Sequence, residues 1–323
     1  MKILSWNVNG IRSYIIDKNT AKHKTKRILT KDSVLFEIIT KYDPDVICFQ
    51  ETRLGQDNFE NFMTESIKSF YPFQYWSASK GTGSRSGNRY SGTSIWCKKE
   101  PDEIITDIPG LNDTEGRVIQ INYPNIIIIN TYTPNAGSNL EYRLRTWEPC
   151  IKIHLKKLGN LGYPVVYCGD NNVANKKDVW FGDALENAWA KEIDFDKKKE
   201  LMKKIKSKKK LHTGETFTPS YSLQERTAFF ELLYETNFID CFRHLKPDVF
   251  NEFTWFSIRD KRAFSSNRGW LIDRFLVQSK FSERIRNCKI LRKIGIRDKE
   301  GHFISDHLPI LLDININRKI IDL

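Results

Sequence analysis

Asp170, Asn171 and Asn172 place one carboxylate and two amides together directly after a short apolar run. The run 164–168 predicts a buried strand, because apolar and aromatic residues follow a proline and Gly169 ends them. A carboxylate and an amide two residues apart could meet one ligand from neighbouring directions. An Asp/Asn turn, in which the side chains bond their own backbone, explains the same residues. The choice between site and turn therefore depends on how the other strands end.

Several other predicted strands also end in polar residues that could take part in chemistry. These residues, at strand ends or in the adjoining loops, are Asn7, Glu51, Tyr132, Asp170, Asn172, Asp273, Asp306 and His307. If the strands pack together, the side chains can meet at one rim. Carboxylates, amides and one histidine without a thiolate form a hard, oxygen-rich set that suits Mg²⁺, with Mn²⁺ as the alternative, rather than zinc. Beside a basic surface, such a set favours metal-assisted phosphodiester hydrolysis.

The elements that must position these residues alternate between strands and helices, which predicts a mixed α/β fold. Strands are expected at 2–8, 46–49, 92–97, 117–122, 126–131, 164–168, 268–277 and 310–314, with Asp273 inside the second-last of them. Helical spacing of apolar residues predicts helices over 33–42, 57–70, 138–158 and 224–238. Asp32 or Ser33 can cap the first helix, and Ser138 with Glu141 forms a capping box for the third.

The chain carries 323 residues and no repeat or proline-rich linker, so we expect one catalytic domain over 1–323. A lysine-rich insertion at about 176–222 interrupts it, either as a solvated segment or as a surface that faces DNA. A net charge of +12 and a pI of about 9.3 indicate a polyanionic partner, with nucleic acid the first candidate. The basic loops 13–32 and 79–91 suit a phosphodiester backbone or a solvated surface.

The six cysteines show no CxxC pair and no zinc spacing, which favours buried thiols in a reducing compartment. No signal peptide is recognisable at the start of the sequence, and the longest aliphatic run, 126–129, is too short to span a bilayer. We therefore expect a soluble, intracellular monomer that has no membrane partner. The sequence leaves nucleus, cytoplasm and viral particle open.

Six segments in order resemble the exonuclease III family of apurinic/apyrimidinic (AP) endonucleases. They are Ser5–Arg12 (SWNVNGIR), Gln50–Thr52 (QET), Tyr132–Gly137 (YTPNAG), Gly169–Ala174 (GDNNVA), Gly269–Asp273 (GWLID) and Ser305–Pro309 (SDHLP). The resemblance runs from residue 2 to about 314. It implies a four-layer αββα sandwich, in which two packed mixed β-sheets are flanked by helices.

The resemblance also implies a role for each matching residue. The metal would be held by Glu51 and Asp306, with Asn7 beside them, and Asp170, Asn172 and His307 lie within its reach. Asp170 would activate or position the attacking water, with Asn172 orienting it. His307 would bond a phosphate oxygen while Asp273 fixes its ring, and Tyr132 would contact the scissile phosphate. The residues expected to contact DNA are Arg12, Arg53, Arg89, Tyr90, Asn135, Trp255, Phe256 and Trp270.

The activity so implied is Mg²⁺-dependent cleavage 5′ to an abasic site in double-stranded DNA, which leaves a 3′-hydroxyl and a 5′-deoxyribose phosphate. Removal of blocking groups from 3′ ends and 3′→5′ exonuclease activity could accompany it, because the same displacement performs them. One alternative is a phosphoesterase of the same fold that acts on inositol phosphates, lipids or RNA. Another, from a different class, is an inactive nucleic-acid-binding module.

Overall fold

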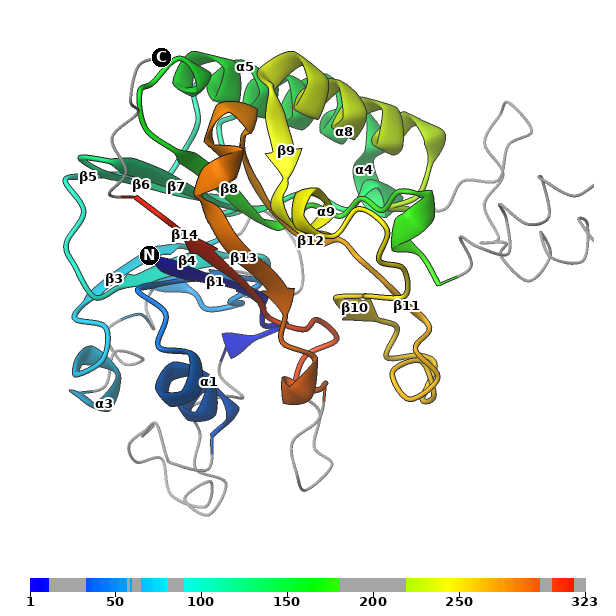
Figure 1. The fold of residues 1–323 in the computed structure, drawn as a ribbon, viewed down its shortest axis with the longest axis horizontal. Helices are drawn as coiled ribbons and strands as arrows, with labels where there is room; N and C mark the ends of the chain where they lie inside the picture. The colour runs from blue at the N-terminus through cyan, green and yellow to red at the C-terminus, as the bar shows by residue number, and fades with distance from the viewer. Residues whose placement is uncertain are drawn as a thin grey trace, which may run out of the picture.

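Two six-stranded mixed sheets lie face to face in the computed structural model, and helices cover the outer face of each (Figure 1). The structure describes residues 1–11, 33–56, 59, 65–80, 90–180, 219–296 and 304–316, apart from the side chain of Ser138. This arrangement confirms the expected four-layer αββα sandwich. None of the helices within these ranges has the length and apolar character needed to cross a membrane.

The first sheet is built around two parallel strands, the first and second of the chain. Its strand order is β13 (Ile285–Ile290), β14 (Ile310–Ile314), β1 (Lys2–Asn7), β2 (Val46–Gln50), β4 (Thr93–Cys97) and β3 (Phe73–Ser77). Because β1 and β2 are parallel, with Asn7 opposite Gln50, their carboxyl ends meet at one edge. The other strand pairs of this sheet are antiparallel.

The second sheet has the same plan. Its order is β5 (Glu103–Ile105), β6 (Val118–Tyr123), β7 (Ile126–Tyr132), β8 (Val165–Asp170), β12 (Asp273–Gln278) and β9 (Phe238–Asp240). Strands β7 and β8 are parallel and pair Tyr132 with Asp170 at their carboxyl ends, while antiparallel β12 starts there, with Asp273 opposite Asp170. Gly169 is required at this point, because a Cβ on it would lie 1.9 Å from the carbonyl oxygen of Thr131.

Three apolar layers hold the sandwich together. Alternate residues of β7 show how: Ile126 and Ile128 pack between the sheets, whereas Ile127 and Ile129 pack under the outer helices. A strand buried on both faces in this way reads as a continuous apolar run, as the sequence does here. The outer helices are α1 (Val34–Tyr42) and α3 (Glu65–Lys68) on the first sheet, and α5 (Glu148–Gly159) and α8 (Leu223–Thr236) on the second.

Short elements complete the described chain. They are α4 (Ala136–Tyr142), the π-helix η5 (Arg143–Trp147), the 3₁₀ turns η6 (Lys176–Asp178), η7 (Ser279–Arg284) and η8 (Arg292–Ile294), α9 (Cys241–Leu245), and the hairpin of β10 (Trp255–Phe256) and β11 (Gly269–Trp270). Ser33 caps α1 as expected, by accepting a hydrogen bond from the amide of Phe36. Of the helix expected over 57–70, α3 is the helical segment that the structure bounds.

Two expectations were wrong in detail. The helix expected over 138–158 begins at Ala136, with Asn135 rather than Ser138 at the cap position. It also changes to a π-helix over Arg143–Trp147 and resumes beside Pro149, whose ring has no N–H to continue the regular ladder. The strand expected over 268–277 is two strands, because Gly269–Trp270 pairs with β10, and Asp273 starts β12 rather than interrupting it.

Candidate active site

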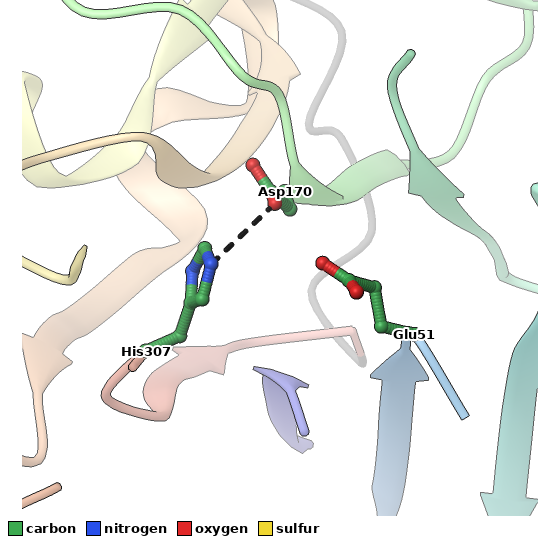
Figure 2. A group of neighbouring side chains, drawn as sticks. All are labelled: Glu51, Asp170 and His307. Carbon is green, nitrogen blue, oxygen red and sulfur yellow. Dashed lines mark ion pairs between the residues drawn. The ribbon is translucent and has the colours of Figure 1, made fainter. Parts of the chain in front are cut away.

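Glu51, Asp170 and His307 converge where the two sheets end at the same rim (Figure 2). Glu51 follows β2 of the first sheet, Asp170 ends β8 of the second, and His307 precedes β14. One potential ligand atom from each lies within 4.8 Å of the others. Glu51 has a φ of 50°, which is uncommon for a residue other than glycine and often marks a functional position.

The amide of Asn7 joins the two carboxylates across the gap between the sheets. Its Nδ2 donates to Glu51 Oε1 at 2.9 Å and to Asp170 Oδ2 at 2.9 Å. Its Oδ1 accepts from the backbone N–H of Asn9, which fixes the orientation of the amide. Asn7 thus positions both acids as a donor in this structure, whereas the sequence predicted a metal ligand.

His307 is oriented by a second carboxylate of the second sheet. Its Nδ1 lies 2.9 Å from Asp273 Oδ2, and its Nε2 lies 3.8 Å from Asp170 Oδ2. Burial alone would lower the pKa of His307, but Asp273 and Asp170 raise it to about 10. The ring is therefore an imidazolium at neutral pH, with Nδ1–H donated to Asp273 and Nε2–H directed to the side of Asp170 (Figure 2).

The two acids of the cluster, Asp170 and Glu51, differ in the direction in which their pKa values are shifted. Burial raises the pKa of Asp170 to about 7, with Asp273 adding to the effect and His307 opposing it. Burial would also raise the pKa of Glu51, but Arg53 and the hydrogen bond from Asn7 lower it. Two carboxylates this close fit a hard divalent cation that prefers oxygen ligands, and the charged ring of His307 would lie beside the ion rather than bind it. The positive charge of the ion would favour the ionised form of Asp170.

Asp306 and Asn172, both expected to touch the metal, are engaged elsewhere. Asp306 Oδ1 accepts from Asn9 and its Oδ2 accepts from the indole N–H of Trp255, at 2.9 and 3.1 Å. It does not belong to the cluster of Glu51, Asp170 and His307. Asn172 Oδ1 accepts from Asn135, while its Nδ2 donates to the carbonyl of Thr133 and lies 3.5 Å from Asp170. Its contacts make it a brace for the Asp170 loop.

Tyr132 faces the cluster from the end of β7. Burial and Glu51 raise the pKa of its phenol, while Arg117 lowers it, so the net effect keeps the phenol neutral and able to donate a hydrogen bond. Buried Arg117 stacks 4.5 Å from the Tyr132 ring centre, and its guanidinium donates to the Tyr90 hydroxyl. Arg53 lies at the mouth of the site with Glu51 Oε2 at 2.6 Å, and 45% of its side chain is exposed.

The aromatic residues expected to contact DNA divide into two groups. Trp255 and Trp270 are partly exposed beside the site, with ring centres 5.8 Å apart. Phe256 is completely buried against Phe253, because consecutive strand residues point to opposite faces. Its predicted contact with DNA is therefore withdrawn.

The remaining residues predicted to contact DNA are either on the surface or outside the described residues. Asn135 and Tyr90 are exposed near the mouth of the site. Arg12 and Arg89 lie outside the described residues, as do positions 181–218 of the lysine-rich insertion.

Arg143 is a positioning residue that the sequence did not reveal. It is fully buried, and its guanidinium donates to the carbonyls of Asn171 and Asn172, at 2.9 and 2.7 Å. It also binds Glu148 at 3.1 Å and Glu225 at 2.9 Å. The buried guanidinium of Arg143 therefore holds the loop after Asp170 in place. In the sequence, Arg143 cannot be told from an ordinary exposed arginine of a helix.

Two hydroxyls, also missed, hold the strand ends. Thr254 accepts from the amides of Ile272 and Asp273, and Ser305 accepts from the amide of His307 while donating to the carbonyl of Asn7. Both threonines and serines make such bonds in ordinary turns, so the residue types gave no signal.

Known proteins are similar to this chain in sequence and in fold. Residues 4–307 match the model of the family described as Endonuclease/Exonuclease/phosphatase. The chain is 32% identical to an exodeoxyribonuclease of Bacillus subtilis over 98% of this chain and 100% of that protein. It is 30% identical to a DNA-(apurinic or apyrimidinic site) endonuclease of Dictyostelium discoideum over 98% of this chain and 71% of that one. The structure of an AP endonuclease from Archaeoglobus fulgidus superposes with a TM-score of 0.68, at 23% identity over 98% and 100% of the two chains.

Proposed function

Because the chain belongs to the endonuclease/exonuclease/phosphatase family, we propose that it is a DNA-repair nuclease that hydrolyses the phosphodiester 5′ to an abasic site. The relatives named for exodeoxyribonuclease and for AP endonuclease activity support a phosphodiesterase. We extend the proposal to 3′→5′ removal of nucleotides and blocking groups, because the same displacement performs these reactions. The observation that carries it is the set of half-buried Glu51 with buried Asp170 and His307 at the junction of the two sheets.

The residues of the site divide the reaction between them. Burial raises the pKa of Asp170 to about 7, and a bound cation would lower it again and keep the carboxylate ionised, so Asp170 can take a proton from the attacking water. The water oxygen forms a bond to phosphorus as the bond from phosphorus to the 3′ oxygen breaks. The released 3′ oxygen takes a proton from solvent and becomes the 3′-hydroxyl, and the phosphate stays on the 5′ side of the abasic sugar.

Charged donors would hold the phosphate while this happens. The imidazolium of His307 can donate from Nε2 to a non-bridging oxygen, since Asp273 holds Nδ1 and keeps the ring charged. The neutral Tyr132 phenol is a second donor. Donors that are already fixed before the reaction need no reorganisation when charge develops, so their contribution to stabilising the transition state is large.

Glu51 and Asp170 are the residues best placed to hold a divalent cation, with His307 beside them, and we propose Mg²⁺. Bound there, the ion would neutralise charge on the phosphate and on the departing oxygen. Asp306 lies outside this set, and each of its carboxylate oxygens accepts one hydrogen bond, from Asn9 or from Trp255.

We further propose that the DNA runs past Arg53, Tyr90, Asn135, Trp255 and Trp270, which surround the mouth of the site. An abasic nucleotide has no base to unstack, so turning its sugar toward the two tryptophans costs less than flipping a normal nucleotide. The two sheets share one inter-sheet core, and this supports a single catalytic domain that carries the 176–222 insertion. We expect it to act as a monomer.

The test is cleavage of a duplex with one synthetic abasic analogue, with Mg²⁺ and with EDTA, beside the same duplex without the analogue. A single cut 5′ to the analogue that is lost in EDTA supports the proposal. An intact abasic duplex, together with phosphate release from an inositol phosphate or an RNA end, would refute it and move the protein to another branch of the family.

A further inference from the structure

A basic cleft lies beside the loop that carries Asp170, outside the catalytic cluster. It has a volume of about 310 Å³ and is formed by η6 and the residue before it, by the first turn of α8, and by α9. The residues that line it are Asn175, Lys176, Lys177, Asp178, Arg226 and Arg243. Four of these six are basic, and one is acidic.

The acid in the cleft is already neutralised from within the protein. Asp178 is buried and binds Arg274 at 2.8 Å and Arg243 at 2.5 Å. Burial would raise its pKa, but these two arginines lower it. Asp178 therefore stays ionised and is paired with Arg243 and Arg274, so it does not neutralise Lys177 or Arg226.

Two of those cations are held in place by aromatic rings rather than by acids. The Arg226 guanidinium stacks 4.6 Å from the Tyr221 ring centre, and its buried Nε has no hydrogen-bond partner among the described residues. The ammonium of exposed Lys177 lies 5.3 Å from the ring centre of Phe250 and pairs with no acid in the described part of the chain. Rings orient a cation without neutralising it, which leaves it able to bind an anion.

The cleft is connected to the catalytic site by a row of aromatic side chains. Tyr221 packs edge-on against Trp270 at 6.0 Å, and Trp270 packs against Trp255 at 5.8 Å. The indole of Trp255 in turn donates to Asp306 at the rim of the catalytic cluster. A strand that lies along these rings from the catalytic cluster would bring a later phosphate to the cleft.

We propose that this cleft, through Lys177 and Arg226, binds a backbone phosphate of the DNA strand on one side of the scissile bond. The proposal rests on the proposed DNA substrate and adds a binding subsite to it. Contacts to phosphate carry no sequence information but fix register, so the subsite would hold the duplex with the lesion over the catalytic cluster. Arginine and lysine at such a point release counterions, which makes their contribution depend on salt.

The experiment measures binding of an abasic duplex by fluorescence anisotropy across a salt series, in an Asp170→Asn background that prevents cutting. Lys177→Gln and Arg226→Gln should each weaken binding and reduce the slope of log K against log salt by about 1. Arg226→Lys, which keeps the charge, should recover most of the affinity. Lys68→Gln is the matched control, because Lys68 is a surface lysine on α3, in the opposite outer layer (Figure 1).

A second arm locates the contact along the DNA. Removing base pairs from one side of the lesion should weaken the wild-type protein and leave the Arg226→Gln variant unchanged, while removal from the other side should affect both equally. An unchanged salt slope in both variants, or an effect no larger than that of Lys68→Gln, would overturn the subsite. If the protein with Asp170 intact does not cut the abasic duplex at all, the proposed function fails instead.

Discussion

Replacing Arg143 by methionine should cost about 3–5 kcal/mol of stability, although the residue touches neither water nor substrate. The guanidinium is fully buried and is bound to two buried acids, Glu148 and Glu225. Methionine fills similar space but leaves both carboxylates without their partner. Removing one member of a buried ion pair strands the other charge, and this penalty exceeds the value of the lost bonds.

The matched control is two residues along the same segment. Arg145 pairs with Glu141 at 3.5 Å, but 78% of its side chain is exposed. Exposed pairs contribute about 0–1 kcal/mol, so Arg145→Met should be close to neutral. Urea unfolding of the two variants and the wild type, extrapolated linearly to water, gives the comparison. Equal stability of the two variants would refute the assignment of Arg143 as a structural hub.

The pH dependence of the penalty gives a second check on its cause. Burial raises the pKa of Glu148 even in the presence of Arg143, which lowers it. Without Arg143, the pKa of Glu148 in the folded protein must rise further above its value in the unfolded chain. The ionised carboxylate then destabilises the folded state, and protonation removes this cost. The cost of Arg143→Met should therefore shrink as the pH falls from 8 toward 5. A cost that stays constant over this range would mean that lost packing, not a stranded charge, dominates.

Three further predictions concern the catalytic cluster. Asp170→Asn should abolish incision of the abasic duplex while the anisotropy Kd stays within about threefold of wild type, since the side chain keeps its shape but loses its base. Asp273→Asn should lower turnover by about 10²–10⁴-fold and move the alkaline limb of the rate profile to lower pH, because the His307 imidazolium, with a pKa of about 10, loses its main stabilising charge. Millimolar Mg²⁺ should raise the melting temperature, because a ligand at 100 times its Kd stabilises the folded state by about 2.7 kcal/mol. Glu51→Gln should remove this rise in melting temperature. Unchanged values in these variants would contradict the corresponding roles.

The sequence predicted the polar residues at the strand ends better than the helix cap and the buried polar residues that support them. Asp170 and Glu51 follow apolar runs with β-branched or aromatic residues, so a strand and then a polar loop could be expected at each. The convergence of several such ends followed from packing the strands in one sandwich. Ser222, in contrast, was not recognised as the cap of α8, although it forms a capping box with Glu225.

Buried polar residues escaped prediction for a physical reason. Arg143 meets residues 28, 29 and 82 positions away, and no local pattern records contacts at such separations. Long charged side chains on a helix are mostly exposed, so a buried one has no signature until its partners are known. The prediction that Phe256 contacts DNA failed for a different reason. A two-residue strand gives too short an alternation of side chains to tell the inward face from the outward one.

The distance between Glu51 and Asp170 depends on polar contacts more than on the apolar core, because the two acids belong to different sheets. Hydrophobic packing is not directional, so the inter-sheet core alone would tolerate a small slide of one sheet over the other. Gln50, the neighbour of Glu51, donates to Asn130 of β7 at 2.7 Å, and Asn130 donates back to the carbonyls of Phe49 and Ser94. These bonds are completely buried and would be left unmade by a slide, at a cost of about 1–3 kcal/mol for each unsatisfied group. The amide pair therefore fixes the register of the sheets directly beneath the acids, and the bridge from Asn7 extends that register to the carboxylates themselves.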